Sequence, residues 1–273
     1  HRHYRRQRQM CIRDRDYRLL RDQKNSVTFD ELLGDAFGAI LWIKENITNY
    51  KGNRDSIAVT GDSAGAYISA MIVNSGKKIA TNGSFSNHFC IKPSYVPKSI
   101  TAEDINNQNL LDVQAAVLSY GGYNLYSPAL KGIFETRKNP FWTLALSKPR
   151  GIFGNNFNAH ENPEMYKAIS PIYNIPKLEE RKLPPQFITS ASKDRVTPVY
   201  AIEEYVRALQ DAGQEVTYWE YKDQGHAYLD SGKTLMSGND FKRDAIPALK
   251  KIMKFLDSKS VSYTHLTLPT IMP

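Results

Sequence analysis

Hydrophobic and polar positions along the chain follow two periods in turn, which predicts alternating strands and helices. A β-branched run at residues 57–60 predicts a short buried strand, and the apolar run at 64–73 predicts a helix buried on several sides. Such alternation is typical of an α/β fold with a mostly parallel sheet flanked by helices. Further strands are predicted at 113–119, 185–190 and 215–221, and further helices at 199–212 and from about 240 to 256.

An earlier helix is predicted from residue 28, where Thr-Phe-Asp-Glu forms a capping-box pattern. Gly34 and Gly38 lie inside it, and their spacing would let the helix approach the sheet closely, although two merely tolerated glycines are an equal alternative. Five apolar residues fall on one face and predict its buried side: Leu33, Phe37, Ile40, Leu41 and Ile47.

Residues 61–65 read Gly-Asp-Ser-Ala-Gly and stand between the predicted strand and the predicted helix. A serine on a sharp strand-to-helix turn is exposed to a base, and small flanking residues let the turn close. The motif therefore predicts Ser63 as a nucleophile on an elbow formed with Gly61, Asp62 and Gly65. The alternative is a tight turn that holds an incidental serine.

A serine nucleophile needs a base and an acid, which this kind of fold places later in the chain in the order Ser, Asp or Glu, His. Asp194 follows the predicted strand 185–190, and His226 follows the next strand, one α/β unit further on. This order predicts Asp194 as the acid and His226 as the base.

Each of these assignments has an alternative. Asp194 stands just before a predicted helix, where an aspartate commonly caps the first turn. Asp223 and Asp230 are rival carboxylates, but they are too close in sequence to His226 to come from a separate loop. Two further histidines, His88 and His160, do not follow a strand in the right chain order.

Two long irregular stretches, roughly 77–111 and 123–180, interrupt the alternation and are expected to form cap or lid insertions. We expect the second to cover the active site and shape the substrate pocket. For single aromatic side chains, packing in a small core of their own is a slightly stronger alternative. The aromatic residues concerned are Phe134, Phe141, Trp142, Phe153, Phe157 and Tyr166.

Length and composition are typical of a single globular domain, since 273 residues with 41% hydrophobic content can bury a substantial core. The chain has no apolar run of 18 residues, so we expect no stable membrane insertion. Its two cysteines provide no disulfide framework. His and Cys lack metal-ligand spacing and there is no phosphate-binding glycine loop, so neither a metal nor a cofactor is expected.

Both ends of the chain are expected to lie outside the domain. Residues 8–15 and 261–271 resemble translated sequencing-adaptor DNA, so 1–15 and 261–273 are interpreted as non-native tails and 16–260 as the catalytic domain. Residues 1–15 hold six Arg and one Asp, a net charge of +5, which leaves +3 of the chain's +8 for the rest. No nucleic-acid partner is therefore expected, and a basic arm that binds nucleic acid is the alternative.

Four sequence features together resemble the hormone-sensitive-lipase-like esterases of the α/β-hydrolase superfamily, over about residues 16–260. They are the Gly-Asp-Ser-Ala-Gly motif, Asp-Tyr-Arg-Leu at 16–19, Ser-Pro-Ile at 170–172 with Leu-Pro-Pro at 183–185, and Gly-His at 225–226. The resemblance implies the α/β-hydrolase fold and hydrolysis of carboxylic esters, such as short-chain or acetyl esters, through an acyl-enzyme on Ser63.

The sequence departs from this family at two places. Ala66 stands where the family has a second glycine after the elbow. Members of the family also carry His-Gly-Gly-Gly before Asp-Tyr-Arg-Leu, whose backbone N–H groups form most of the oxyanion hole, and the sequence lacks it. We therefore expect an amino-terminally truncated fragment without the first strands, in which the Ala64 N–H is the remaining oxyanion donor.

Three alternatives remain open from the residues alone. The same triad cleaves amides, arylformamides or peptides, because the pocket rather than the triad sets the substrate. A ligand-binding protein on this fold would be expected to lose a triad member, and none is lost here. The basic-arm interpretation depends only on residues 1–15. The sequence leaves open the compartment, the oligomeric state and the acyl and alcohol groups of a small ester substrate.

Overall fold

The computed structural model describes residues 11–14, 16–80, 91–134, 140–230, 238–259 and 264–268. Its strands are β1 (Cys11–Asp14), β2 (Ile57–Asp62), β3 (Ala115–Ser119), β4 (Gln186–Ala191), β5 (Val216–Tyr221) and β6 (Thr264–Leu268). Its helices are α1 (Asp22–Asn25), α2 (Phe29–Asn46), η1 (Ile47–Tyr50), α3 (Ala64–Ala80), α4 (Ala102–Asn107), α5 (Tyr126–Leu130), α6 (Pro140–Leu144), α7 (Pro163–Ala168), η2 (Pro171–Asn174), α8 (Val199–Asp211), η3 (Phe241–Ala245) and α9 (Ile246–Ser258).

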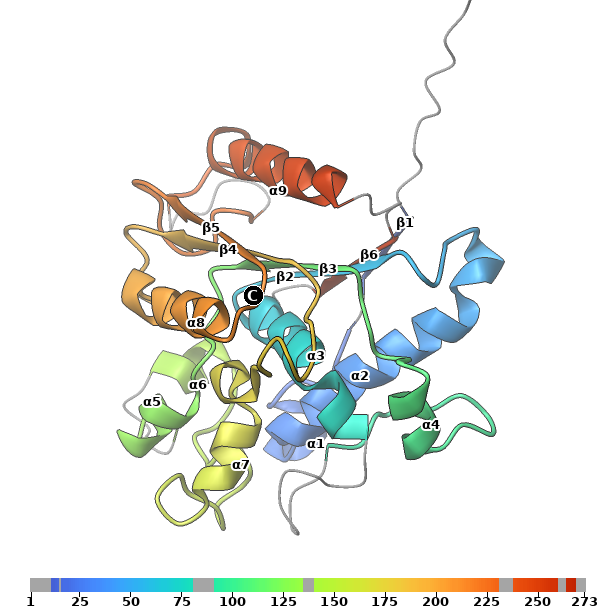
Figure 1. Cartoon of the computed structure of the whole chain (residues 1–273). Coiled ribbons are helices and arrows are strands. Elements are labelled where there is room, and N and C mark those ends of the chain that lie inside the picture. Colours follow the sequence, from blue (N-terminus) through green and yellow to red (C-terminus); the bar gives the residue numbers. More distant parts are fainter. Residues whose placement is uncertain are drawn as a thin grey trace, which may run out of the picture.

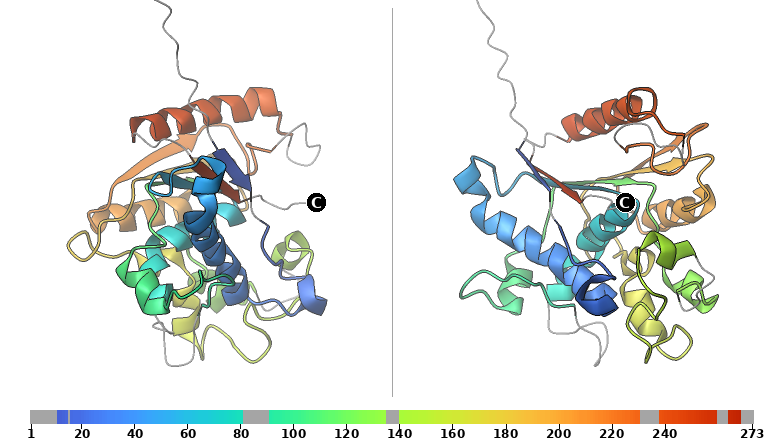
Figure 2. Two further views of the ribbon diagram at one scale, coloured as in Figure 1. Left: turned by 90° about the vertical axis from the view of Figure 1, so that its right-hand side faces the viewer. Right: turned by 180° about the vertical axis from the view of Figure 1, so that it is seen from behind.

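The strands form one sheet in the order β1-β6-β2-β3-β4-β5, and every pair in it is parallel. Helix α9 covers one face, whereas α2, α3 and α8 cover the other, with the shorter helices α4 to α7 further from the sheet on that second side (Figure 1; Figure 2). The predicted α/β-hydrolase fold with a mostly parallel sheet is thus confirmed.

Alternate residues of the central strands serve the two faces of the sheet, as the period of a strand requires. On the α9 face, Ala58 of β2 and Phe187 of β4 pack with Phe255. On the opposite face, Val59 and Ile188 belong to the main core with the apolar side of α2. Burial on both faces explains why these strands read as continuous apolar runs in the sequence.

Helix α2 begins as the sequence predicts. The Thr28 N–H donates to Glu31 Oε2 at 3.0 Å, which completes the capping box. The five apolar residues expected on one face are all 0–1% exposed. Neither of the two interpretations of Gly34 and Gly38 is right. Both glycines allow a close approach, but the chain that passes over them is the segment at 92–95 and not the sheet.

Strands β1 and β6 lie in the two segments that the sequence analysis placed outside the domain. β6 pairs with β2 along residues 57–61, and β1 pairs with β6. A parallel strand buried on both faces presents a full row of N–H and C=O groups at its edge, and a neighbouring strand satisfies them.

The region expected to be irregular contains several short helices, and its aromatic side chains mostly join the main core. Phe134, Trp142, Phe153 and Tyr166 are at most 6% exposed and belong to that core, whereas Phe157 is exposed. The indole N–H of Trp142 donates to the Phe134 carbonyl at 2.7 Å. These four residues thus pack in the core, as the alternative interpretation held, but in the main core and not in a small core of their own.

A buried polar cluster ties this region to α3, α8 and β4. The Asn74 side-chain amide of α3 donates to the Pro171 carbonyl at 3.0 Å and to the Tyr205 hydroxyl at 2.9 Å. The Tyr205 hydroxyl donates in turn to Gln186 Oε1 at 3.1 Å. These bonds satisfy polar groups that are buried, so the cluster holds four elements in one arrangement.

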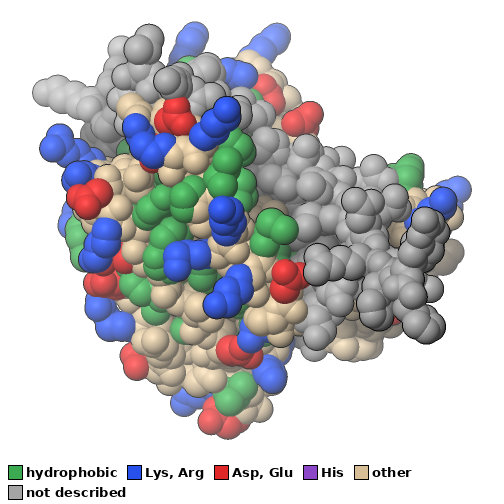
Figure 3. All heavy atoms as spheres, turned by 90° about the horizontal axis from the view of Figure 1, so that it is seen from above, with side chains coloured by type: hydrophobic (Ala, Val, Ile, Leu, Met, Phe, Trp, Pro, Cys, Tyr) green, Lys and Arg blue, Asp and Glu red, His purple; other side chains and the backbone are tan. Residues whose placement is uncertain are grey.

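The predicted closing helix, from about 240 to 256, is divided into two parts. Asp240 accepts from the N–H groups of Lys242 and Arg243, and a π-helical turn then leads into α9, whose second residue is Pro247. Proline has no N–H to donate to the preceding turn, so the regular helix begins only at Ile246. The outer side of α9 carries Lys side chains interspersed with hydrophobic ones (Figure 3).

Within the described ranges, no helix combines the length and the apolar character needed to cross a bilayer.

We predict that Gly34→Ala lowers the free energy of unfolding by about 1–3 kcal/mol, as overpacking does. A Cβ at this position would lie 2.2 Å from the Lys92 carbonyl oxygen, which outweighs the gain in helix propensity. Urea unfolding followed by tryptophan fluorescence measures the change. The control is Gly225→Ala, where a Cβ meets nothing within 4 Å. An equal effect of the two substitutions would contradict the close approach.

Candidate active site

Ser63 occupies the turn between β2 and α3 with a φ of +50°. Its N–H donates to the Ser119 carbonyl at the end of β3, at 2.9 Å. A Cβ added at Gly61 would lie 2.2 Å from the Gly65 carbonyl carbon, so the turn closes only because Gly61 has no side chain. A left-handed backbone at a non-glycine residue is strained, and here the packed turn holds it in place.

Ala66, the departure from the family motif, fits against a glycine that the sequence analysis did not single out. Ala66 is fully buried, and a Cβ added at Gly121 would lie 2.8 Å from the Ala66 Cβ. The methyl group of Ala66 thus occupies space that the missing side chain at 121 leaves open. The turn therefore accepts alanine at this position.

The structure brings the predicted base to the predicted nucleophile. Ser63 Oγ lies 2.8 Å from His226 Nε2, which is hydrogen-bond distance. His226 comes from the loop after β5, and Asn239 supports that loop by donating from its side-chain amide to the His226 carbonyl at 2.8 Å. The next residue, Ala227, has a φ of +63°, so the loop turns sharply directly after the imidazole.

Asp194 completes the chain of contacts on the other side of the imidazole. Its Oδ2 accepts from His226 Nδ1 at 2.7 Å, and its side chain is fully buried. Its Oδ1 accepts from the N–H groups of Val196 and Thr197, at 2.8 and 2.9 Å. The helix that follows has Pro198 as its N-cap, so Asp194 is not the cap of α8.

Two opposing effects act on the pKa of Asp194. Burial is the largest and by itself raises the pKa, but the hydrogen bond and charge of His226, together with the bonds from Thr197, outweigh it. The net result is a pKa below the ordinary aspartate value. The carboxylate is therefore ionised at neutral pH, as a partner of an imidazole N–H should be.

The rival residues have other contacts. Asp223 forms an exposed ion pair with Lys193 at 3.0 Å. Burial, together with the charge of Asp62, raises the pKa of Asp230. His160 lies at the surface, with Nε2 3.1 Å from the Leu130 carbonyl, and His88 falls outside the described residues. Among the described histidines, His226 is thus the one beside Ser63.

Ala64 is the first residue of α3 and is exposed. The first N–H groups of a helix have no intrahelical acceptor and form the positive end of the helix dipole. This position suits a donor to an oxyanion at Ser63, as the resemblance implies. The assignment of Ala64 stays a prediction.

Two residues that touch the triad carried no signal of their own in the sequence. Tyr120 follows β3 directly, and its ring makes an edge-on contact with the His226 ring, with centroids 5.0 Å apart. The Thr197 hydroxyl lies 2.8 Å from Asp194 Oδ2 and 2.9 Å from the Tyr120 carbonyl oxygen, and its single proton serves one acceptor at a time. The one general signal for Tyr120 is its place directly after a predicted strand, because residues at that edge of a parallel sheet lie close to the site.

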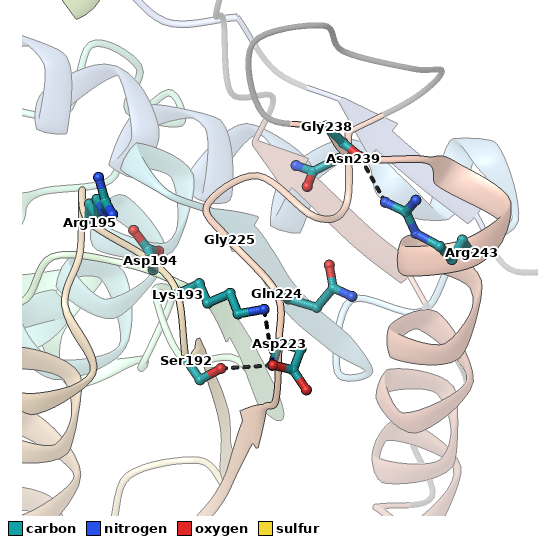
Figure 4. Close-up of a pocket in the computed structure, with 10 residues that line it drawn as sticks. All are labelled: Ser192, Lys193, Asp194, Arg195, Asp223, Gln224, Gly225, Gly238, Asn239 and Arg243. Atoms are coloured by element: carbon teal, nitrogen blue, oxygen red, sulfur yellow. Dashed lines mark hydrogen bonds and ion pairs between the residues drawn. The ribbon is translucent and has the colours of Figure 1, made fainter.

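A hollow of about 800 Å³ lies beside the acid loop, lined by residues 192–195, 223–225, 238, 239 and 243 (Figure 4). Lys193 reaches Asp223 there, and Arg243 donates to the Gly238 carbonyl at 2.7 Å (Figure 4). Neither Ser63 nor His226 lines the hollow. Of the three triad residues, the hollow thus reaches only Asp194.

No group of three or more His, Cys, Asp or Glu side chains among the described residues is arranged to hold a metal ion.

Comparison with known proteins agrees with this architecture. A family profile described as alpha/beta hydrolase fold matches residues 16–230, and the chain belongs to that family. It is 30% identical over 195 residues to esterase LipQ of Mycobacterium tuberculosis, a match that covers 71% of this chain and 38% of LipQ. It is 25% identical over 218 residues to a probable isoprenylcysteine alpha-carbonyl methylesterase of Arabidopsis thaliana, covering 78% of this chain and 43% of that protein. The chain thus spans less than half the length of these relatives.

Solved structures give the same fold at lower identity. A thermophilic esterase of Thermogutta terrifontis superposes with a TM-score of 0.58 at 18% identity, covering 90% of this chain and 69% of that one. A truncated carbohydrate esterase from gut microbiota gives a TM-score of 0.56 at 18% identity, covering 86% and 70%. At such identity these matches show the fold alone.

We predict that Asp194→Asn lowers the free energy of unfolding at neutral pH, and that the deficit shrinks as the solution is acidified. The folded-state pKa lies below the unfolded value, so the carboxylate contributes its full stabilisation above the unfolded pKa of about 3.9. That contribution is lost as the pH falls through the folded pKa. Urea unfolding of parent and variant between pH 7 and pH 3 measures the difference. A deficit that stays constant over this range would show that the ionised form has no special role.

Proposed function

We propose that this protein is a serine-dependent carboxylic ester hydrolase that works through an acyl-enzyme on Ser63, with His226 as base and Asp194 as acid. The observation that supports this most is the unbroken line of contacts from Ser63 Oγ to His226 Nε2 at 2.8 Å and from His226 Nδ1 to Asp194 Oδ2 at 2.7 Å. Three residues from three separate loops meet in the order that nucleophilic catalysis requires.

In the first half of the reaction, Ser63 Oγ attacks the ester carbonyl carbon while His226 Nε2 takes the hydroxyl proton. Asp194 keeps the other imidazole proton on Nδ1 and stabilises the imidazolium. The Ala64 N–H donates to the oxyanion. His226 then gives its proton to the departing alcohol, which leaves the acyl group on Ser63.

In the second half, a water molecule takes the place of the alcohol. His226 accepts one proton from the water as its oxygen attacks the acyl carbon, and then returns that proton to Ser63 Oγ. The carboxylic acid is released and the free enzyme is restored. Each proton taken by the imidazole is thus given back within the same half-reaction.

The names of relatives support an ester as substrate, since one is described as an esterase and another as a probable methylesterase. One solved structure of the Thermogutta esterase is described as butyrate bound. We therefore propose short-chain acyl esters as the substrate class and p-nitrophenyl butyrate as the first probe. A matched arylformamide assayed in parallel tests whether amides are cleaved instead.

We predict that Ser63→Ala abolishes both covalent labelling by a fluorophosphonate and the release of p-nitrophenol. The phosphonate reacts once with the activated hydroxyl, so mass spectrometry of the labelled protein detects the nucleophile even when turnover is slow. Removing the hydroxyl removes the only atom that can carry the label at this position.

Ser258→Ala is the matched control, because it removes a serine hydroxyl in α9 that bonds to the Phe255 carbonyl. It should keep the labelling rate of the parent. Labelling that persists in Ser63→Ala would move the nucleophile elsewhere. A parent that binds the ester but is neither labelled nor able to release product would favour a ligand-binding protein.

We predict that Asp194→Asn lowers turnover by about 10⁴-fold, because an amide can hold the imidazole in the wrong tautomer. The initial rate with p-nitrophenyl butyrate, normalised to folded protein, measures the effect. Asp223→Asn is the control: this exposed carboxylate pairs with Lys193, and its loss should change the rate by less than about twofold. If the Asp223 variant fell as far as the Asp194 variant, the assignment of the acid would be wrong.

A further inference from the structure

Tyr120 combines complete burial with an uncommon backbone conformation. It follows the last residue of β3, is 0% exposed and has a φ of +42°. Bulky residues are rarely found in the left-handed region, and this strained conformation persists only where the surrounding structure imposes it. Its N–H donates to the Thr189 carbonyl of β4 at 2.9 Å, which anchors the strained residue to the neighbouring strand.

From this position Tyr120 reaches each of the three loops that supply the site. Its hydroxyl donates to Asp62 Oδ2 in the elbow at 3.0 Å. Its ring makes a T-shaped contact with the His226 imidazole, with ring centroids 5.0 Å apart and ring planes inclined at 65°. Its carbonyl oxygen lies 2.9 Å from the hydroxyl of Thr197, which also contacts Asp194.

We propose that Tyr120 is a positioning residue of the active site, which sets the orientation of the His226 imidazole and links it to the elbow through Asp62. The assignment rests on the proposed Ser63–His226–Asp194 reaction and extends it. Tyr120 exchanges no proton with the substrate and acts through its three neighbours.

The physical reason is that an imidazole held by two hydrogen bonds can still tilt about the axis joining them. The Tyr120 ring packs against one side of the imidazole and limits this tilt, because edge-to-face aromatic pairs have a preferred geometry. The ring of Tyr228 also packs against the Tyr120 ring, with centroids 4.7 Å apart. Burial, and next the charge of Asp62, raises the pKa of Tyr120 well above its ordinary value, so its hydroxyl stays a donor to Asp62.

Asp62 has a defined part in this arrangement. It is the second residue of the Gly-Asp-Ser-Ala-Gly motif, yet it does not take part in the line from Ser63 to Asp194. As acceptor of the Tyr120 hydroxyl, it connects the residue before the nucleophile to the residue that packs on the base. This bond fixes the distance between the elbow and the Tyr120 ring.

Two substitutions at 120 separate the ring from the hydroxyl. Tyr120→Leu removes both and is expected to slow fluorophosphonate labelling of Ser63 by about 10²-fold, the effect of a misplacement of about 1 Å at a reacting group. Tyr120→Phe keeps the ring and removes the bond to Asp62, and should slow labelling by roughly threefold to tenfold. With p-nitrophenyl butyrate, both are expected to lower kcat and leave KM within about twofold, since only the base is misplaced.

A spectroscopic readout does not depend on activity. The His226 Nδ1 proton, bonded to buried Asp194, should give a downfield proton NMR signal, which His226→Ala identifies by its loss. In Tyr120→Leu we expect the signal to shift or to broaden beyond detection. In Tyr120→Phe we expect the signal to remain, with a smaller shift than in Tyr120→Leu.

The matched control is Tyr205→Leu, because Tyr205 is equally buried and also donates a hydrogen bond, but to Gln186 and away from the triad. It should lower the thermal unfolding temperature as Tyr120→Leu does, while the labelling rate and the His226 signal stay as in the parent. A double-mutant cycle of Tyr120→Phe with Asp62→Ala should give a rate no lower than the slower single variant, as expected for two ends of one bond.

The positioning role is overturned if folded Tyr120→Leu keeps the parent's NMR signal and a labelling rate within about threefold. It is also overturned if Tyr205→Leu alters both readouts equally. Should Tyr120→Leu not fold, additive effects in the Tyr120→Phe and Asp62→Ala cycle would overturn the link. A parent that is not labelled at Ser63 refutes the proposed function, whereas the NMR comparison still decides the role of Tyr120.

Discussion

The parallel pairing of β2, β3, β4 and β5 is the constraint on which the site depends. Parallel strands end at the same edge of a sheet, so the loops that follow them share one small region of space. Ser63 follows β2, Asp194 follows β4 and His226 follows β5. Distances of 2.7 and 2.8 Å between side chains more than 30 residues apart are a consequence of this common edge. The same edge holds Tyr120, which follows β3.

Burial of the acid has a cost that its neighbours offset. A carboxylate removed from water is destabilised unless hydrogen bonds and an opposite charge replace the lost hydration. Asp194 receives two backbone N–H groups on one oxygen and the imidazole on the other. The backbone of the loop 194–197 thus donates hydrogen bonds to the side chain of its own first residue. This explains why the carboxylate stays ionised although it is buried.

Much of this arrangement is predictable from the sequence, because strong local signals coincide with the elements that matter. The strand before Ser63, the buried helix after it, the capping box at Thr28 and the chain order of the three candidate residues all have a direct pattern in the residues. Chain order predicts the spatial meeting of Ser63, Asp194 and His226, because α/β units place their loops at one edge in a regular way.

What could not be predicted depends on contacts between distant segments. Gly34 gives no sign that its partner is the chain at Lys92, and Gly121 gives no sign that it faces Ala66. The aromatic residues of 123–180 were interpretable as a pocket or as core, and only packing distinguishes the two. Strand β6 depends on the free edge of β2, which no local pattern at 264–268 can reveal.

The contact between Ala66 and Gly121 joins two positions that are 55 places apart in the sequence. A Cβ at 121 would lie 2.8 Å from the Ala66 Cβ and equally close to the Tyr123 ring, so the space holds the methyl group of Ala66 and no second one. A side chain at 121 should therefore occur in natural variants only where the residues at 66 and 123 are both smaller. In a library that randomises 66 and 121 alone, functional members should vary on the helix and keep glycine after the strand.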